Sequence, residues 1–273
     1  MYILNNAKIV FIGAGNMAEA LVKGLLETNV STHQIIVTDF LQERLDHFKS
    51  TYSVEGLRDN SQAVKEADIT VLAVKPQMMK EVLAGMRGEY GKETSFISIA
   101  AGVTTRAIEG MLGEGTSVVR VMPNTPALVQ AGLSAICSGQ WAQEAHLKLA
   151  ERVFRSVGIV VRVEEKEMDA VAAVSGSGPA YVFYLMEAME EAACQLGLSK
   201  ETAKQLVQTT VQGAAQLVIQ SDDPPDELRK RVTSKGGTTE AALDVLEKGQ
   251  VFKAFIDAIQ AAQRRSLELS GNK

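Results

Sequence analysis

The stretch KIVFIGAGNMAEALVKGLLE, residues 8–27, decides the fold. Its first five residues are a strand-length apolar run, the next six form the pattern G-x-G-x-x-A, and the remainder has helical spacing. Such a glycine pattern is a strong signal only between a first strand and a first helix. It lies there, so the stretch predicts a dinucleotide-binding turn. The alternative is a tight strand–helix turn without a ligand.

The residues of this turn have separate roles in that prediction. Gly13 permits the tight bend, Gly15 lets the backbone approach a pyrophosphate, and Ala18 allows close helix–sheet packing. The helix start would offer free N–H groups and a favourable dipole to the phosphates. The predicted cofactor contacts of the turn are Gly13, Ala14, Gly15, Asn16, Met17 and Ala18.

The sequence up to about residue 163 predicts a parallel sheet covered on both faces. Strand-length runs rich in β-branched residues alternate there with segments of helical spacing. The expected strands are residues 8–12, 34–38, 69–74, 95–99 and 117–122, with further strands at 134–138 and 158–163. The expected helices include residues 16–27, 41–48 and 76–86.

From about residue 164 the pattern is helical throughout. Apolar residues between 206 and 218 share one face, whereas residues 179–196 are apolar around most of the circumference. A helix of the second kind needs cover on most sides, so we expect a homodimer formed through this half, unless the helix is the centre of its own lobe. The predicted domains are residues 1–164 and 165–273.

Composition bounds the class of protein. The chain has 273 residues and a net charge of −5, which gives no footprint for nucleic acid or an anionic membrane. Cys137 and Cys194 are far apart and show no metal-site spacing, so we expect no metal and a reduced compartment. Neither a signal peptide nor a membrane-spanning run is evident. We expect a soluble, cytoplasmic protein.

The choice between NADH and NADPH depends on the end of the second strand. Asp39 stands where an acidic residue would accept hydrogen bonds from the adenosine ribose, and its charge would repel a 2′-phosphate. Arg44 could serve a phosphate instead, or pair with Glu43 or Asp46. The pattern favours NADH over NADPH.

Histidine does not supply an evident acid or base. His33, His47 and His146 do not follow a strand or a glycine loop, although enzymes that act on a hydroxyl or ketone usually use such a residue. Lys75 follows a strand, at the edge where ligands bind, and its alternative is a solvated loop lysine. Lys235 is a weaker candidate.

The stretch SKGGTTEAAL, residues 234–243, places two glycines directly before a helical run. One interpretation is a turn capped by Thr238 or Thr239. The other is a loop whose consecutive N–H groups, at the positive end of a helix, bind an anion. Both remain open at this point.

Six segments together resemble pyrroline-5-carboxylate reductase, in order over nearly the whole chain. They are GAGNMAEAL, AVKPQ, AAGV, PNTP, SGSGPAY and VTSKGGTT. The resemblance implies a Rossmann-like N-terminal domain, an all-α C-terminal dimerisation domain, and NAD(P)H-dependent reduction of 1-pyrroline-5-carboxylate to L-proline. Two positions depart from the family: Lys235 stands where many members carry proline, and Asp39 replaces the small polar residue that suits NADPH in some relatives.

The resemblance also implies roles for individual residues. Ser234 and the amides of Thr238 and Thr239 would hold the substrate carboxylate, and the Thr239 hydroxyl would bond the ring nitrogen and relay a proton. A cyclic imine can take its proton from water, so positioning replaces a strong acid. The implied substrate contacts are Glu165, Ser175, Val232, Ser234, Gly236, Gly237, Thr238 and Thr239; the further cofactor contacts are Asn60, Ala73, Val74, Lys75 and Ala101.

Two other functions are compatible with the sequence. A β-hydroxyacid dehydrogenase also pairs a dinucleotide domain with a helical lobe and uses lysine as its acid and base. A dinucleotide-binding regulator without turnover is the alternative outside enzymes. A higher oligomer than the dimer is left open.

Overall fold

The computed structural model describes residue 4 and residues 6–270. Its residues form two compact units. One, the sheet unit, contains the described residues up to Ser177 and residues 262–270; the other, the helical unit, is Gly178–Ala261. The predicted domain boundary at 164/165 is not the same division, because residues 165–177 pack with the sheet unit.

The sheet unit contains an eight-stranded sheet in the order β3-β2-β1-β4-β5-β6-β7-β8. Neighbouring strands are parallel except β6 and β7, which are antiparallel. The strands are β1 Ile9–Ile12, β2 Ile35–Thr38, β3 Glu55–Leu57, β4 Ile69–Leu72, β5 Ser95–Ser98, β6 Val118–Met122, β7 Gly132–Ser138 and β8 Gly158–Arg162. Strand β3 is absent from the sequence prediction, and two strands of the predicted parallel sheet, β7 and β8, run antiparallel to the others.

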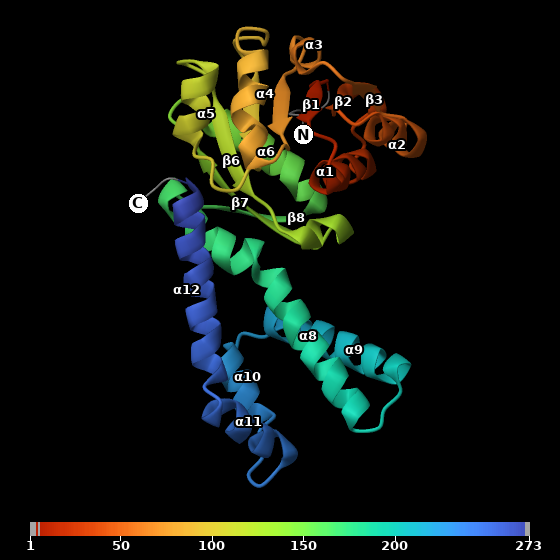
Figure 1. Cartoon of the computed structure of the whole chain (residues 1–273), viewed down its shortest axis with the longest axis vertical. Coiled ribbons are helices and arrows are strands. Elements are labelled where there is room, and N and C mark those ends of the chain that lie inside the picture. The colour runs from red at the N-terminus through yellow and green to blue at the C-terminus, as the bar shows by residue number, and fades with distance from the viewer. Residues whose placement is uncertain (1–3, 5, 271–273) are drawn as a thin grey trace. The chain divides into compact units, whose positions relative to one another are not determined.

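Two layers of helices cover this sheet (Figure 1). One core joins it to α1 (Asn16–Glu27), α2 (Gln42–Tyr52) and α6 (Glu144–Phe154). The other joins it to α3 (Asn60–Val64), α4 (Met79–Met86) and α5 (Thr105–Leu112). The four residues of β1 are buried, since they face helices on both sides. The predicted doubly covered α/β fold is confirmed.

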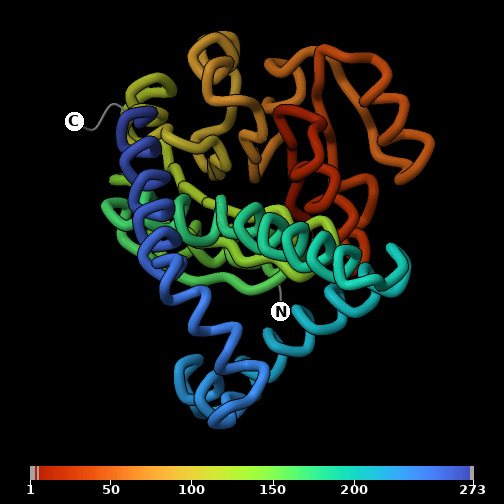
Figure 2. Tube along the Cα trace, turned by 60° about the horizontal axis from the view of Figure 1, so that its bottom comes forward, coloured from red at the N-terminus to blue at the C-terminus, as the bar shows by residue number. Residues whose placement is uncertain are grey.

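The helical unit consists of α8 (Gly178–Gln195), α9 (Lys200–Gln220), α10 (Pro225–Arg231), α11 (Thr238–Lys248) and the first part of α12 (Val251–Ser270). Helices α8 and α9 lie side by side (Figure 2). Within Gly178–Ala261, all of which is described, only Ala203 and Val207 are buried. Large apolar side chains of α8, among them Phe183 and Tyr184, are 61% and 73% exposed in the single chain.

Short helical turns complete the chain. They include the 3₁₀ turns Thr32–Gln34, Pro76–Met78, Thr125–Val129, Arg155–Val157 and Glu165–Glu167, the helix α7 Met168–Val171, and a π-helical turn, Ala172–Gly176. In the described part of the chain, no helix is both long enough and apolar enough to cross a membrane. Both cysteines are free thiols, Cys137 buried and Cys194 half-buried.

Candidate functional site: a dinucleotide cavity and an anion-binding loop

The glycine turn has the geometry that its sequence predicts. Gly13 has a φ of +102°, and a Cβ there would lie 2.7 Å from the carbonyl oxygen of Ala73. At Gly15 a Cβ would meet nothing within 4 Å, because this residue borders open space. Gly15 is the N-cap of α1 and has no side chain to bond the free N–H groups that follow. These groups are free to bind a phosphate.

A cavity of about 870 Å³ opens at the carboxyl ends of β1, β2, β3 and β4. This edge of an open α/β sheet is where ligands bind. Its lining brings together most of the predicted cofactor contacts from the sheet unit: Gly13, Ala14, Gly15, Asp39, Asn60, Ala73, Val74 and Lys75. Asn16, Met17 and Ala18 form the first turn of α1, and Ala101 follows β5.

Asp39 and Arg44 hold the Ala14 peptide groups from two sides. The Asp39 carboxylate accepts hydrogen bonds from the N–H of Ala14 at 2.9 Å and of Leu41 at 3.0 Å. Arg44 donates from Nε to the carbonyl of Ala14, 2.8 Å away. These hydrogen bonds hold the backbone of the glycine loop. Each carboxylate oxygen keeps a lone pair for a ribose hydroxyl.

Arg44 does not pair with Glu43 or Asp46, the partners suggested by sequence spacing. It forms an ion pair with Glu19 on α1, at 2.8 Å. His47 and Tyr52 also contact the Glu19 carboxylate, at 2.7 and 3.0 Å. Burial raises the pKa of Glu19, but the hydrogen bonds from His47, Arg44 and Tyr52 outweigh it, and the pKa falls to about 2. The charge of Arg44 is therefore already matched within the protein.

The end of β3 adds residues that the sequence analysis missed. Register pairs Leu57 with Thr38, so Arg58 and Asp39 lie at the same sheet edge. Arg58 lines the cavity and donates from Nη2 to the carbonyl of Phe40, 2.8 Å away. No local pattern reveals this contact, because its partners are 18 residues apart.

Asn60 follows Arg58 closely and occupies the same edge. Its carboxamide oxygen accepts a hydrogen bond from the Thr38 hydroxyl at 2.6 Å, and its amide nitrogen has no partner among the residues that the structure describes. A free amide donor at a ribose site can bond a hydroxyl or phosphate oxygen.

Glu165 is bound by side chains and backbone of the sheet unit. Its carboxylate accepts hydrogen bonds from the N–H and hydroxyl of Thr105, at 2.8 and 2.7 Å, and lies 3.5 Å from Arg120 Nη1. The Arg120 side chain is only 4% exposed, so the pair compensates a buried charge. Burial, followed by the Glu165 charge, raises the pKa of the neighbouring Cys137 thiol to about 12. Glu165 thus anchors its segment to the start of α5.

Two of the quoted motifs meet at Ser175. Asn124 of PNTP donates from Nδ2 to the Ser175 hydroxyl at 3.2 Å and accepts from the N–H of Leu133 at 2.9 Å. Ser175 lies in the π-helical turn, a geometry frequent at functional sites. A Cβ at Gly176 would meet the flexible end of the Met122 side chain, which would have to shift. The turn thus lies against the last residue of β6.

The loop before α11 belongs to the helical unit. Gly236 has a φ of +72°, and a Cβ at Gly237 would collide with the Ser234 hydroxyl oxygen. Gly237, and neither threonine, is the N-cap, and among the described residues this helix start has no capping hydrogen bond from a side chain. The Glu240 carboxylate accepts the Gly236 N–H at 2.6 Å. The interpretation that a threonine caps this helix is wrong, and the amides of Thr238 and Thr239 are left free.

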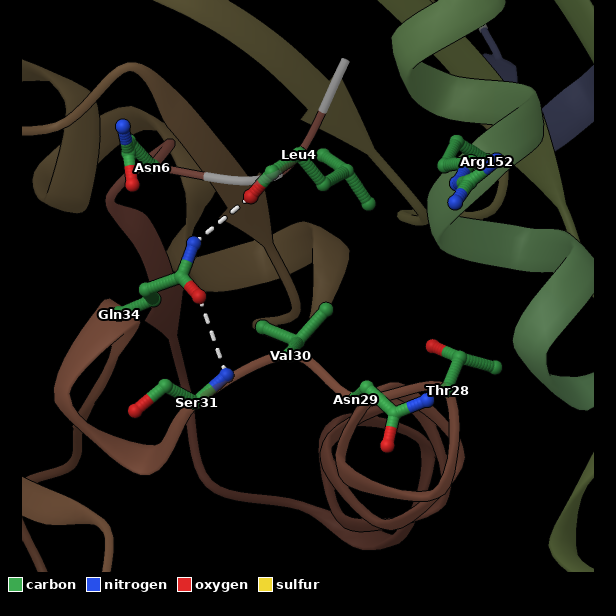
Figure 3. Close-up of a pocket in the computed structure, with 8 residues that line it drawn as sticks. All are labelled: Leu4, Asn6, Thr28, Asn29, Val30, Ser31, Gln34 and Arg152. Carbon is green, nitrogen blue, oxygen red and sulfur yellow. Dashed lines mark hydrogen bonds between the residues drawn. The ribbon is translucent and has the colours of Figure 1, made fainter. Parts of the chain in front are cut away.

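A second hollow, of about 560 Å³, lies at the other end of the strands (Figure 3). Gln34 spans it: its amide donates to the carbonyl of Leu4 at 2.7 Å, and its carbonyl accepts the N–H of Ser31 at 3.0 Å. These bonds tie the start of the chain to the turn before β2. None of the motifs quoted above contributes to this hollow.

Comparison with known proteins gives two family matches along the chain. Residues 165–269 match the model described as pyrroline-5-carboxylate reductase dimerisation, and residues 8–102 match that described as NADP oxidoreductase coenzyme F420-dependent. A pyrroline-5-carboxylate reductase of Pseudomonas aeruginosa is 42% identical over 98% of each chain. One from Methanosarcina acetivorans is 40% identical over 97% of this chain and 99% of the relative.

The chain belongs to the pyrroline-5-carboxylate reductase family. The predicted family, function and enzyme class are confirmed by these matches. Solved structures agree: a pyrroline-5-carboxylate reductase from Coxiella burnetii is 44% identical with a TM-score of 0.89, covering 97% of this chain and 99% of its own. That from Plasmodium falciparum, solved with NADP bound, is 31% identical with a TM-score of 0.90, covering 98% and 99%.

Proposed function

We propose that the chain reduces 1-pyrroline-5-carboxylate to L-proline with hydride from a nicotinamide cofactor bound in the cavity of the sheet unit. The observation that carries the proposal is the glycine turn, whose helix start has no side-chain cap and which lines a cavity of about 870 Å³. The chain is also similar over 98% of its length to a pyrroline-5-carboxylate reductase. The pyrophosphate would lie on the free amides of the first turn of α1.

The substrate carboxylate binds, in this proposal, at the loop before α11. Ser234 and the amides of Thr238 and Thr239 hold it, because free N–H groups at the start of an eleven-residue helix favour an anion. Gly236 and Gly237 give the loop its shape, and Val232 contributes apolar contact. The half-buried Thr239 hydroxyl bonds the ring nitrogen and relays a proton from water.

We propose that two residues of segment 165–177, in the sheet unit, also act in substrate binding. Ser175, oriented by Asn124, contacts the substrate, and Glu165 acts by fixing its segment to Thr105. In this proposal, residues 165–273 form the substrate-binding and dimerisation domain. The exposed apolar helices of the helical unit support a homodimer. We also propose that the protein is located in the cytoplasm.

For the cofactor, we propose that NADH is preferred and NADPH is also used. Asp39 lies at the end of β2, where its carboxylate can accept ribose hydroxyls and opposes a 2′-phosphate. Replacing Asp39 with serine is expected to shift the ratio of kcat/KM values several-fold toward NADPH. An unchanged ratio would exclude Asp39 from the ribose site.

The reaction is tested by following cofactor absorbance with pyrroline carboxylate and with a panel of hydroxyacids. Only the imine should be reduced. Thr239→Ala should lower kcat/KM for the imine about 100-fold, since it removes a hydrogen bond aimed at the reacting nitrogen. Its dissociation constant for NADH should change less than twofold. Thr239→Ser keeps the hydroxyl and should retain most activity. Equal losses in turnover and cofactor binding would indicate a purely structural threonine.

A further inference from the structure

Arg58 has a place in the cavity that the proposed reaction does not yet use. The cations among the cavity-lining residues are Arg44, Arg58 and Lys75. Arg44 is neutralised by Glu19, and Lys75 follows β4, away from the β2–β3 edge where Asp39 lies. Arg58 follows β3, directly beside Asp39 in the register of the sheet.

The guanidinium of Arg58 is anchored but not neutralised. Its one hydrogen bond within the described residues goes to the neutral carbonyl of Phe40, so most of its five donors and its whole charge are free. The nearest acidic neighbour in sequence, Asp59, uses one oxygen to accept from the N–H groups of Ser61 and Gln62. Those bonds turn that carboxylate toward the start of α3.

We infer that Arg58 is a specificity-determining residue: it binds the 2′-phosphate of NADPH and so lets this site accept both cofactors despite Asp39. The inference rests on the proposed cofactor site. At the ribose position, a carboxylate suits a free 2′-hydroxyl and a nearby arginine suits a 2′-phosphate. The structure places one of each at adjacent strand ends.

The carbonyl bond to Phe40 makes the arrangement directional. It holds one edge of the guanidinium against the loop after β2, so the remaining edge can present two parallel N–H groups to phosphate oxygens. Lysine at this position would keep the charge but lose the fork. The expected order of affinity for a 2′-phosphate is therefore arginine, then lysine, then glutamine.

Binding of adenosine fragments tests this without turnover. Calorimetry with 2′,5′-ADP and with 5′-AMP compares ligands that differ only in the 2′-phosphate. Arg58→Gln should weaken 2′,5′-ADP binding about tenfold and 5′-AMP binding less than twofold. Arg58→Lys should weaken the former about threefold. In turnover, kcat/KM should fall about tenfold for NADPH only. High salt should weaken the binding of 2′,5′-ADP to the parent more than the binding of 5′-AMP, because the 2′-phosphate adds a charge that salt screens.

Two control variants separate a specific role from a general one. Arg155→Gln removes an exposed arginine outside the cavity and should change neither ligand. Arg44→Gln loosens the glycine loop and should weaken both ligands alike.

Equal losses for 2′,5′-ADP and 5′-AMP in Arg58→Gln, or no loss, would overturn the inference. Failure of the parent to bind either ligand would overturn it together with the cofactor site. Intact selective binding without imine reduction would contradict only the proposed reaction.

Discussion

The sheet unit and the helical unit bury their apolar residues to different degrees. Every residue of β1 is at most 1% exposed, and two cores flank the sheet. In the helical unit, by contrast, Leu196 and Ile219 are 84% and 82% exposed. A single chain thus completes the first unit and leaves the second uncovered. Large exposed apolar faces indicate an interface.

The difference assigns separate sources of stability to the two units. The sheet unit is stabilised by its own core, because its mostly parallel sheet is buried on both faces within one chain. The helical unit would gain most of its apolar burial from a second copy, and the family match to a dimerisation domain over 165–269 agrees with this. Its stability should then depend on protein concentration.

A charge introduced on α8 should have the largest effect, because it tests whether α8 lies in the interface between two copies. Tyr184 is 73% exposed, and in a two-fold symmetric dimer a substitution there occurs twice in the interface. Tyr184→Asp removes about 2 kcal/mol of apolar burial per copy and buries a carboxylate, so self-association should weaken at least 100-fold. Sedimentation velocity across a dilution series measures it.

The control for this change is Gln208→Asp, which adds the same charge at an exposed polar position on α9. It should leave the dissociation constant within a few-fold. A Tyr184→Asp protein that associates as tightly as the parent would show that α8 is not in the interface.

Two phenylalanines test whether the sheet unit is stabilised by its own core. One is buried in the single chain and the other is exposed. Phe96 on β5 is fully buried and packs edge-on against Tyr90, with ring centroids 4.8 Å apart. Phe96→Ala should lower the free energy of unfolding by about 3–5 kcal/mol because it leaves a cavity. Phe40→Ala, at a side chain 62% exposed, should cost less than about 1 kcal/mol.

Urea unfolding followed by fluorescence of Trp141, the single tryptophan, reports on the sheet unit. Equal destabilisation by the two alanines would mean that Phe40 is covered in solution, and the contrast between the units would be weaker than the structure implies.

Local pattern explains which parts of the sheet unit could be predicted. Residues 16–27 were expected as a helix and form α1, because apolar periodicity and the glycine turn act together there. Strand β3, Glu55–Leu57, has no apolar run; its pairing with β2 forms it. The antiparallel direction of β7 has no local signal either, since apolar content does not record strand direction.

The same distinction holds for the site. The glycine turn and the two-glycine loop are contiguous in sequence, so their backbone demands can be read directly. Arg58, Thr105 and Arg120 were missed because their partners lie 18 to 60 residues away in the sequence. The grouping of the last part of α12 with the sheet unit likewise has no local signal: there the Ser266 hydroxyl donates to Asp169 at 2.6 Å, 97 residues away in the sequence.

The smallest expected effect concerns acid stability of the sheet unit. The folded-state pKa of Glu19 is about 2, below its ordinary value of 4.5. The unfolded chain therefore binds the proton more readily, and the stabilisation present above about pH 4.5 is lost as the pH falls toward 2. For a side chain 24% exposed, solvent screening leaves about 1 to 2 kcal/mol.

Glu19→Gln should remove this part of the pH dependence, so the free energy of unfolding, followed by Trp141 fluorescence, should fall less steeply between pH 5 and 2. Tyr52→Phe removes one of the three hydrogen-bond donors and should give an intermediate slope.

Because Arg44 also holds the carbonyl of Ala14, acid should loosen the cofactor loop before it unfolds the sheet. Cofactor affinity should then decline at a higher pH than fluorescence does. Coincident midpoints would show that the loop and the core of the sheet unit respond to acid as one.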